Sequence, residues 1–281
     1  MLEGQIININ SNRYKVLCND KEFICSARGK FRNDKVTPMV GDYVLIDKQN
    51  NQIIKILPRK NFLLRPNVAN VDIALIITSV KKPNLDLYLL DKLLTLVTFN
   101  KIKPIICFTK IDLLNDEQLI NFKKIRNYYE KLYDVIDNNQ IEIFKQKVQN
   151  KIVVLCGQTG SGKSTFINKI DPSLNLKTNE ISSSLGRGIH TTRMTTLYKE
   201  DSFYICDTPG FSSLDLVNIE LEDLKKSFLE FNNYNCKFKE CNHINTFGCQ
   251  IENNENILKS RYENYTLFLK EINENRSKLF K

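Results

Sequence analysis

The chain is constrained most by a glycine-rich segment that lies between an apolar run and a helix-like run. The segment consists of Gly157, Gln158, Thr159, Gly160, Ser161, Gly162, Lys163, Ser164 and Thr165. The residues before it, 152–156, predict a buried strand, and residues 166–170 predict the start of a helix. A strand, a glycine loop and a helix in this order are typical of a loop whose backbone N–H groups bind phosphate.

Two side chains make this prediction specific. We expect Lys163 to reach the β- and γ-phosphates of a nucleotide and the Ser164 hydroxyl to ligate Mg²⁺. The alternative is a plain turn of glycine and serine between a strand and a helix, and it leaves the register of these two residues unexplained. The segment therefore predicts an α/β domain that binds a nucleotide together with Mg²⁺.

Length and composition limit the class of protein. A chain of 281 residues is long enough for two or three domains. No apolar run has the length of a membrane span, and the first residues carry no secretory signal. We therefore expect a cytoplasmic monomer without a membrane partner. In that setting the eight cysteines favour a metal site over disulfides.

Residues 1–66 combine short β-prone stretches with a basic charge. They hold 12 Lys and Arg against 6 Asp and Glu, which is +6 of the net charge of +9. The predicted strands are 5–8, 14–17, 22–25, 43–46 and 53–57, which suit a small barrel of the OB type. Residues 27–35 place cations around Gly29 and Phe31. This stretch is either an RNA-contacting loop or an ordinary solvated basic loop.

Residues 67–213 alternate apolar strands with amphipathic helices, which predicts a parallel sheet that binds ligands at the carboxyl ends of its strands. The strand 103–108 leads into a tetrad, Thr109, Lys110, Ile111 and Asp112. The tetrad resembles the N-K-x-D guanine motif of GTPases, with Thr109 in place of Asn. A carboxylate at 112 accepts hydrogen bonds from the N1–H and N2 amine of guanine, whereas adenine presents an acceptor at N1. Asp112 therefore predicts a preference for GTP over ATP.

A polar loop, 182–196, is predicted to sense the γ-phosphate. It contains His190, Thr191 and Thr192, and we expect one of the two threonines to bind Mg²⁺. The sequence does not choose between them. His190 orients the attacking water, contacts phosphate, or is an exposed loop histidine.

The strand 203–206 ends in Asp207-Thr208-Pro209-Gly210, which matches the D-x-x-G pattern of GTPases. We expect Asp207 to hold Mg²⁺ through water and the Gly210 N–H to contact the γ-phosphate. The next residue, Phe211, stands where many GTPases carry the Gln that orients the attacking water. Basal hydrolysis is therefore expected to be slow, and an outside partner is expected to complete the site.

The order of these motifs indicates a circular permutation, because the guanine tetrad precedes the phosphate loop. A compact sheet tolerates such a change when its original termini lie close together. The chain then runs from Phe211 directly into residues 214–281. The nucleotide state is therefore predicted to reach that segment through the backbone.

Residues 214–281 contain a set of metal ligands, Cys236, Cys241, His243 and Cys249. Three thiolates and one imidazole form a closed tetrahedral site for one structural Zn²⁺ per chain. The alternatives are a chance cluster or a disulfide. The five remaining cysteines lie in or beside apolar strands and are expected in the core. Helices are predicted at 221–232 and 254–280.

Together these features resemble the RsgA (YjeQ) family of circularly permuted GTPases. The resemblance covers the basic barrel, Arg65-Pro66 and residues 69–72 at the junction, and the permuted order of motifs. It also covers residues 186–192, 207–211 and the Cys/His spacing. Three features depart from the family pattern: Thr109, the interruptions Ile189 and Arg193, and the lack of a recognisable Ser-Ala-like loop near 135–139.

The resemblance implies an OB domain at 1–66, a GTPase domain at 67–213 and a zinc-binding helical domain at 214–281. It implies binding of GTP or GDP with Mg²⁺, and hydrolysis stimulated by the small (30S) ribosomal subunit during its late maturation. The barrel and the zinc domain would contact 16S rRNA. Two alternatives remain at this point, an rRNA-binding assembly factor with a non-hydrolysing nucleotide latch, and a P-loop kinase.

Overall fold

The computed structural model describes residues 1–27, 31, 36–64, 67–172, 195–200, 202–207, 215–216 and 218–279. The chain forms two compact units. The first contains Met1–Leu75, Gln140–Cys156 and Lys163–Ser212, and the second contains Ile76–Asn139, Gly157–Gly162 and Ser213–Lys281. Strand β8, Ile73–Ser79, begins in the first unit and ends in the second. The division into domains 1–66, 67–213 and 214–281 stays a prediction.

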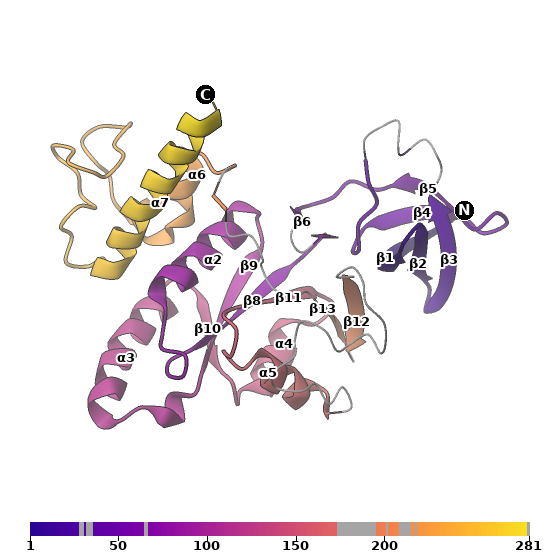
Figure 1. Ribbon diagram of the computed structural model, residues 1–281, viewed down its shortest axis with the longest axis horizontal. Coiled ribbons are helices and arrows are strands. Elements are labelled where there is room, and N and C mark those ends of the chain that lie inside the picture. Colours follow the sequence, from indigo (N-terminus) through magenta and orange to yellow (C-terminus); the bar gives the residue numbers. More distant parts are fainter. Residues whose placement is uncertain are drawn as a thin grey trace. The chain divides into compact units, whose positions relative to one another are not determined.

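The first unit opens with a closed five-stranded barrel (Figure 1). Its strands are β1 Leu2–Asn10, β2 Arg13–Cys18, β3 Lys21–Ala27, β4 Tyr43–Asp47 and β5 Gln52–Ile56. They follow the order β1-β2-β3-β5-β4, and the antiparallel pairing of β1 with β4 closes the barrel. Alternate apolar side chains such as Ile6, Val16 and Ile46 are fully buried inside. The predicted OB-type barrel is confirmed, whereas most of its basic loop, 28–30 and 32–35, lies outside the described residues.

A short hairpin follows the barrel. Strand β6, Phe62–Leu64, pairs with β7, Asn67–Ala69. Polar side chains fasten it, because Asn61 exchanges hydrogen bonds with the backbone N–H and C=O of Val71 at 2.9 and 2.8 Å. These bonds join residues ten positions apart, which no local pattern reveals.

The rest of the first unit carries the strand that enters the glycine loop. Strands β11 Ile152–Cys156, β13 Phe203–Asp207 and β12 Thr196–Glu200 lie in that order, with β11 and β13 parallel. Helices α4 Ile141–Lys147 and α5 Lys163–Ile170 belong to the same unit. Phe144 of α4 packs edge-to-face against Phe166 and Phe203, with ring centroids 5.3 and 5.8 Å apart.

The second unit contains β9 Lys103–Thr109 and β10 Asp134–Asp137, in the order β10-β9-β8. Its first helices are α2 Leu87–Phe99, η1 Ile111–Leu113 and α3 Asp116–Glu130. Helix α3 begins with a capping box, in which the Asn115 side chain accepts from the Gln118 N–H and Gln118 bonds the Asn115 N–H in return. No helix among the described residues combines the length and the apolar character that crossing a bilayer requires.

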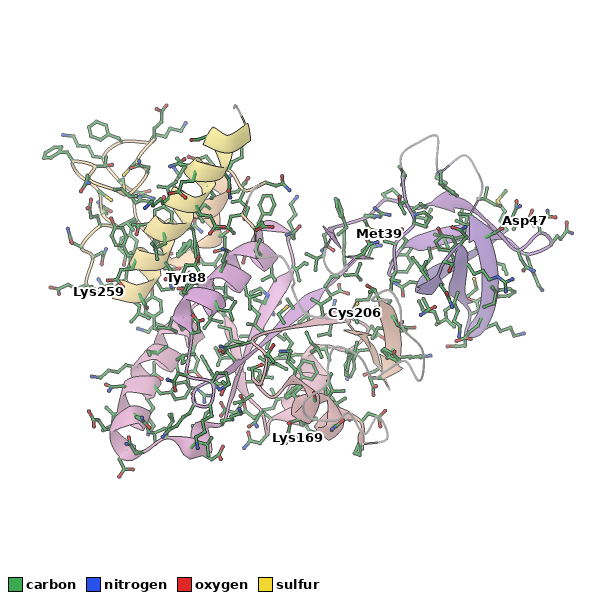
Figure 2. The ribbon with its side chains drawn as sticks, in the orientation of Figure 1. Met39, Asp47, Tyr88, Lys169, Cys206 and Lys259 are labelled. Atoms are coloured by element: carbon green, nitrogen blue, oxygen red, sulfur yellow. The ribbon has the colours of Figure 1, made fainter. Side chains whose placement is uncertain are left out.

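The C-terminal part of the second unit consists of α6 Leu221–Ser227, η3 Leu229–Asn233 and α7 Lys259–Leu279. The sequence predicted one helix over 221–232, but the helix breaks at Phe228. This ring is fully buried and packs on Phe231 and Tyr265, at 5.1 and 5.3 Å between centroids. Helix α7 lies beside α2, which carries Tyr88 (Figure 2). The Tyr88 ring packs edge-to-face on Phe268 of α7, with ring centroids 5.2 Å apart.

Helices α2 and α7 are also joined by a buried ionic cluster. The Arg261 guanidinium is fully buried and donates to Asp91 at 2.8 Å and to both carboxylate oxygens of Glu230 at 2.7 and 2.9 Å. Tyr129 and Asn264 each donate to Asp91 at 2.6 Å. Every charge in the cluster therefore has a hydrogen-bonded partner, as burial requires.

Candidate guanine nucleotide site and metal site

The glycine-rich segment forms the tight loop that the sequence predicted. Gly157, Gly160 and Gly162 have φ values of 134°, 77° and 98°, which residues other than glycine rarely adopt. The Ser161 N–H donates to the Gln158 carbonyl at 3.1 Å and closes a turn within the loop. A Cβ on Gly157 would lie 2.0 Å from the Ile77 carbonyl oxygen, so glycine is required where the loop leaves β11.

Lys163 and Ser164, the two side chains expected to act on phosphate and Mg²⁺, begin helix α5 in the first unit. Both are buried, and burial lowers the pKa of Lys163 to about 8. The Ser164 hydroxyl is buried and has no hydrogen-bond partner in the described part of the chain. An orphaned buried hydroxyl at this position fits a ligand of Mg²⁺.

The T-K-x-D tetrad lies against the glycine loop within the second unit. Thr109 ends β9, is 2% exposed, and its hydroxyl donates to the Ser161 carbonyl at 2.6 Å. The Lys110 ammonium donates to the Gly160 carbonyl at 2.8 Å. The two motifs, about 50 residues apart in sequence, are therefore in direct contact. Ile111 and Asp112 follow in η1, where the Asp112 side chain is exposed.

A third segment joins this site, and sequence reasoning missed it. The Lys110 ammonium also bonds the Lys82 carbonyl, and Pro83 lies close to Gly160. The Val80 N–H donates to the Thr109 carbonyl at 3.1 Å. Residues 80–83 contain no recognisable motif. The only indication that they belong to the site is their position at the carboxyl end of the buried strand β8.

Most residues that are predicted to contact the γ-phosphate lie outside the described residues. Asp207 ends β13, and its backbone pairs with Thr196 of β12. The Asp207 side chain, Gly210, Phe211, His190, Thr191 and Thr192 lie outside the described residues. Their expected roles stay predictions.

The four predicted metal ligands gather in the second unit, with all their ligand atoms within 4.8 Å of one another. The His243 Nδ1 lies 3.5, 3.5 and 3.7 Å from the sulfurs of Cys236, Cys241 and Cys249, and Cys236 and Cys249 are 3.9 Å apart. A tetrahedron with Zn–S near 2.3 Å and Zn–N near 2.05 Å has S···N edges of about 3.6 Å and S···S edges of about 3.8 Å. The donor set and its dimensions therefore fit Zn²⁺.

The surroundings of this cluster also suit a metal. Backbone N–H groups of His243, Gln250, Ile251 and Glu252 donate to the sulfurs at 3.3–3.4 Å, which stabilises thiolates. Burial, with Lys225 nearby, lowers the pKa of His243 to about 4. The imidazole is therefore neutral at physiological pH, the state in which histidine ligates metals.

A barrel followed by an α/β domain, whose guanine tetrad precedes and contacts its phosphate loop, defines the class of circularly permuted P-loop GTPases. The chain belongs to the RsgA GTPase family. The family model for the RsgA GTPase matches residues 56–217, and the model for the RsgA N-terminal domain matches residues 3–54. The predicted resemblance and the GTPase activity are thereby confirmed.

Relatives and solved structures agree with this assignment. "Small ribosomal subunit biogenesis GTPase RsgA 2" of Oceanobacillus iheyensis is 43% identical over 97% of this chain and 98% of its own length. "Small ribosomal subunit biogenesis GTPase RsgA" of Enterococcus faecalis is 42% identical over 100% and 98%. YjeQ from Thermotoga maritima has a TM-score of 0.82 at 33% identity, covering 96% of this chain and 98% of its own. YloQ, described as a circularly permuted GTPase, has a TM-score of 0.81 at 33% identity, covering 98% and 96%.

Proposed function

We propose that this chain acts in the biogenesis of the small ribosomal subunit, as a cytoplasmic monomer that binds the 30S subunit and hydrolyses GTP faster when bound to it. The names of its full-length relatives support the subunit as the partner. The nucleotide part is supported above all by the contact of Thr109 and Lys110 with the phosphate loop. With the two motifs in contact, one GTP could place its base at the guanine motif and its phosphates at the phosphate loop.

Each predicted site residue then has a role. Asp112 accepts hydrogen bonds from the guanine N1–H and N2 amine, while Lys163 contacts the β- and γ-phosphates. Mg²⁺ is held by Ser164 and by Thr191 or Thr192, with Asp207 acting through water. Gly210 donates its N–H to the γ-phosphate, and His190 orients the attacking water. The buried, unpartnered Ser164 hydroxyl supports the Mg²⁺ assignment.

The RNA partner, 16S rRNA, is supported by charge and by one surface of residues 236–249, the segment that carries the four metal ligands and is called the zinc loop below. Phe247 and Phe238 are 77% and 50% exposed, and the Lys237 ammonium lies 4.7 and 5.7 Å from their ring centroids. Exposed rings beside a cation suit unstacked bases next to phosphate. Structural Zn²⁺ would hold the loop that carries these side chains, whose Lys237 N–H also bonds the Gly248 carbonyl at 3.1 Å.

The function is tested by phosphate release from GTP with purified 30S subunits, with 50S subunits and with neither. We expect slow release alone and a rise of about tenfold or more with 30S subunits only, because Phe211 leaves the catalytic site to be completed from outside. Lys163→Ala with 30S subunits controls for contaminating GTPases. Nucleotide binding without release in any of these mixtures would favour the non-hydrolysing latch.

A further inference from the structure

We propose that Tyr262 and Tyr265 of α7 are positioning residues for the metal site, and that their hydroxyls set its affinity for Zn²⁺ by fixing the backbone of the ligand His243. The proposal rests on the Zn²⁺ binding proposed above. All four ligands lie within the zinc loop, and the described residues 236–249 contain neither helix nor strand. The shape of the loop therefore depends on interactions other than regular backbone pairing.

Three consecutive backbone carbonyls of the loop, those of residues 241–243, accept hydrogen bonds from α6 and α7. The Lys225 ammonium donates to the first at 3.2 Å. The Tyr265 hydroxyl donates to the second and the Tyr262 hydroxyl to the third, each at 2.8 Å. The first and third of these residues are metal ligands. The two helices therefore bind the backbone of the loop at the ligands themselves.

The two tyrosines together determine the backbone conformation of His243. The carbonyl that Tyr265 binds belongs to the peptide before His243, and the carbonyl that Tyr262 binds belongs to the peptide after it. The orientations of these two peptides define φ and ψ of the histidine. Its φ is 64°, in the left-handed region that is unfavourable for a residue with a side chain. The hydrogen bonds from α7 hold this conformation, in which the imidazole reaches the three sulfurs.

The hydrogen bond from Tyr265 also acts on a second ligand. A trans peptide points its C=O and its N–H in opposite directions. With the Asn242 carbonyl directed at Tyr265, the His243 N–H of the same peptide donates to the Cys241 sulfur at 3.3 Å. Such N–H groups stabilise a thiolate, the form of cysteine that binds a metal. Tyr265 therefore supports both the imidazole and one of the thiolates.

Helix α7 can position the ligands because its first turns are themselves fixed. Tyr265 is 0% exposed, and its ring packs against Phe231 with centroids 5.0 Å apart. The Phe231 ring packs edge-to-face on His243 at 5.3 Å. Arg261, one turn before Tyr265, binds Asp91 of α2 at 2.8 Å. The ligands are thus oriented by a packed part of the second unit and not by the loop alone.

The test compares Tyr262→Phe, Tyr265→Phe and the double variant with the wild-type chain, by competition for Zn²⁺ against a chromophoric chelator. Each change keeps the ring and removes one hydroxyl. Each single variant should lose about threefold or more in zinc affinity, and the double variant about tenfold or more. Tyr128→Phe is the matched control, because its hydroxyl donates to Glu230 at 3.0 Å, outside the zinc loop. Its zinc affinity should stay within about twofold of the wild type.

Two results would overturn the proposal: a double variant whose zinc affinity is within about twofold of the wild type, or an equal loss in Tyr128→Phe. A purely structural role for the tyrosines would give the first result, since it changes the stability of α7 without changing metal affinity. Circular dichroism shows whether each variant is folded. If the double variant is not, the single variants carry the test, and affinities equal to that of Tyr128→Phe overturn the proposal. A wild-type chain that binds no Zn²⁺ would instead contradict the proposed metal site, so the two failures are distinguishable.

Discussion

Single glycines set the backbone of the phosphate loop, and they differ in how much space surrounds them. At Gly157 a Cβ would lie 2.0 Å from the Ile77 carbonyl oxygen, and backbone on one side or the other would have to move. At Gly160 the nearest atom to a Cβ is Pro83 Cδ at 3.6 Å, an ordinary contact. Both glycines have positive φ, so alanine at either position is conformationally strained. For Gly160→Ala this strain is the only cost, whereas Gly157→Ala adds a steric clash.

We therefore expect Gly157→Ala to abolish GDP binding and to lower the free energy of unfolding by more than about 2 kcal/mol. Gly160→Ala should cost about 1–2 kcal/mol and weaken GDP binding only moderately. Urea denaturation and GDP titration of both variants measure the difference. Equal effects at the two positions would show that the Ile77 carbonyl does not limit the loop.

Residue 109 also shows where sequence reasoning stops. The sequence showed that Thr109 lacks the amide of Asn, and it placed the tetrad and the phosphate loop at strand ends of one sheet. It gave no sign that the hydroxyl reaches Ser161, because that bond joins residues 52 positions apart. The contact between the tetrad and the loop depends on tertiary packing, which no local sequence pattern encodes.

At the scale of whole elements, two ion pairs join α2 to α7, and they differ in burial. Arg261 and Asp91 are both 0% exposed, whereas Lys92 and Glu271 have side chains that are 11% and 26% exposed. Removing one member of a buried pair leaves an uncompensated charge. Lys92 and Glu271 keep partial access to water, so the loss of one of these charges is less costly.

Arg261→Met should therefore lower the free energy of unfolding by about 3–5 kcal/mol, because Asp91 and Glu230 both lose their cation. The matched variant Lys92→Met, which breaks Lys92–Glu271, should cost less, about 1–2 kcal/mol, because water still reaches Glu271. Denaturant unfolding followed by circular dichroism compares them. A similar cost for both variants would mean that the buried cluster contributes no more than the outer pair.

Elements were predictable where a periodic pattern or a cap marks them. Barrel strands such as β2 and β4 alternate buried and more exposed residues, and Asn115 caps α3 with its capping box. Strand β10, Asp134–Asp137, was missed because four residues carry too little pattern, and its backbone pairs with Ile105–Phe108 of β9. The break at Phe228 was missed because a buried ring, rather than Gly or Pro, ends the helix.

At the scale of the whole molecule, the proposed binding to the 30S subunit would draw on the basic charge and on the exposed rings of the zinc loop. Residues 1–66 carry +6 of the net charge of +9, which favours any polyanion and weakens with salt. Phe247, which is exposed, would add a contact that salt does not screen, because stacking on a base does not depend on charge. The two contributions are separable by their salt dependence.

Phe247→Ala should therefore weaken binding of the 30S subunit by about five- to a hundredfold while leaving the slope of affinity against salt unchanged. Lys237→Gln should instead reduce that slope by about one, because one phosphate contact is lost. Leu267→Ala is the matched control, since Leu267 is 51% exposed on α7 and lies away from the zinc loop in sequence. The measurement is a filter-binding titration with labelled subunits at several salt concentrations. If Phe247→Ala binds as Leu267→Ala does, the zinc loop does not stack on RNA, and the basic barrel must supply the affinity for the subunit.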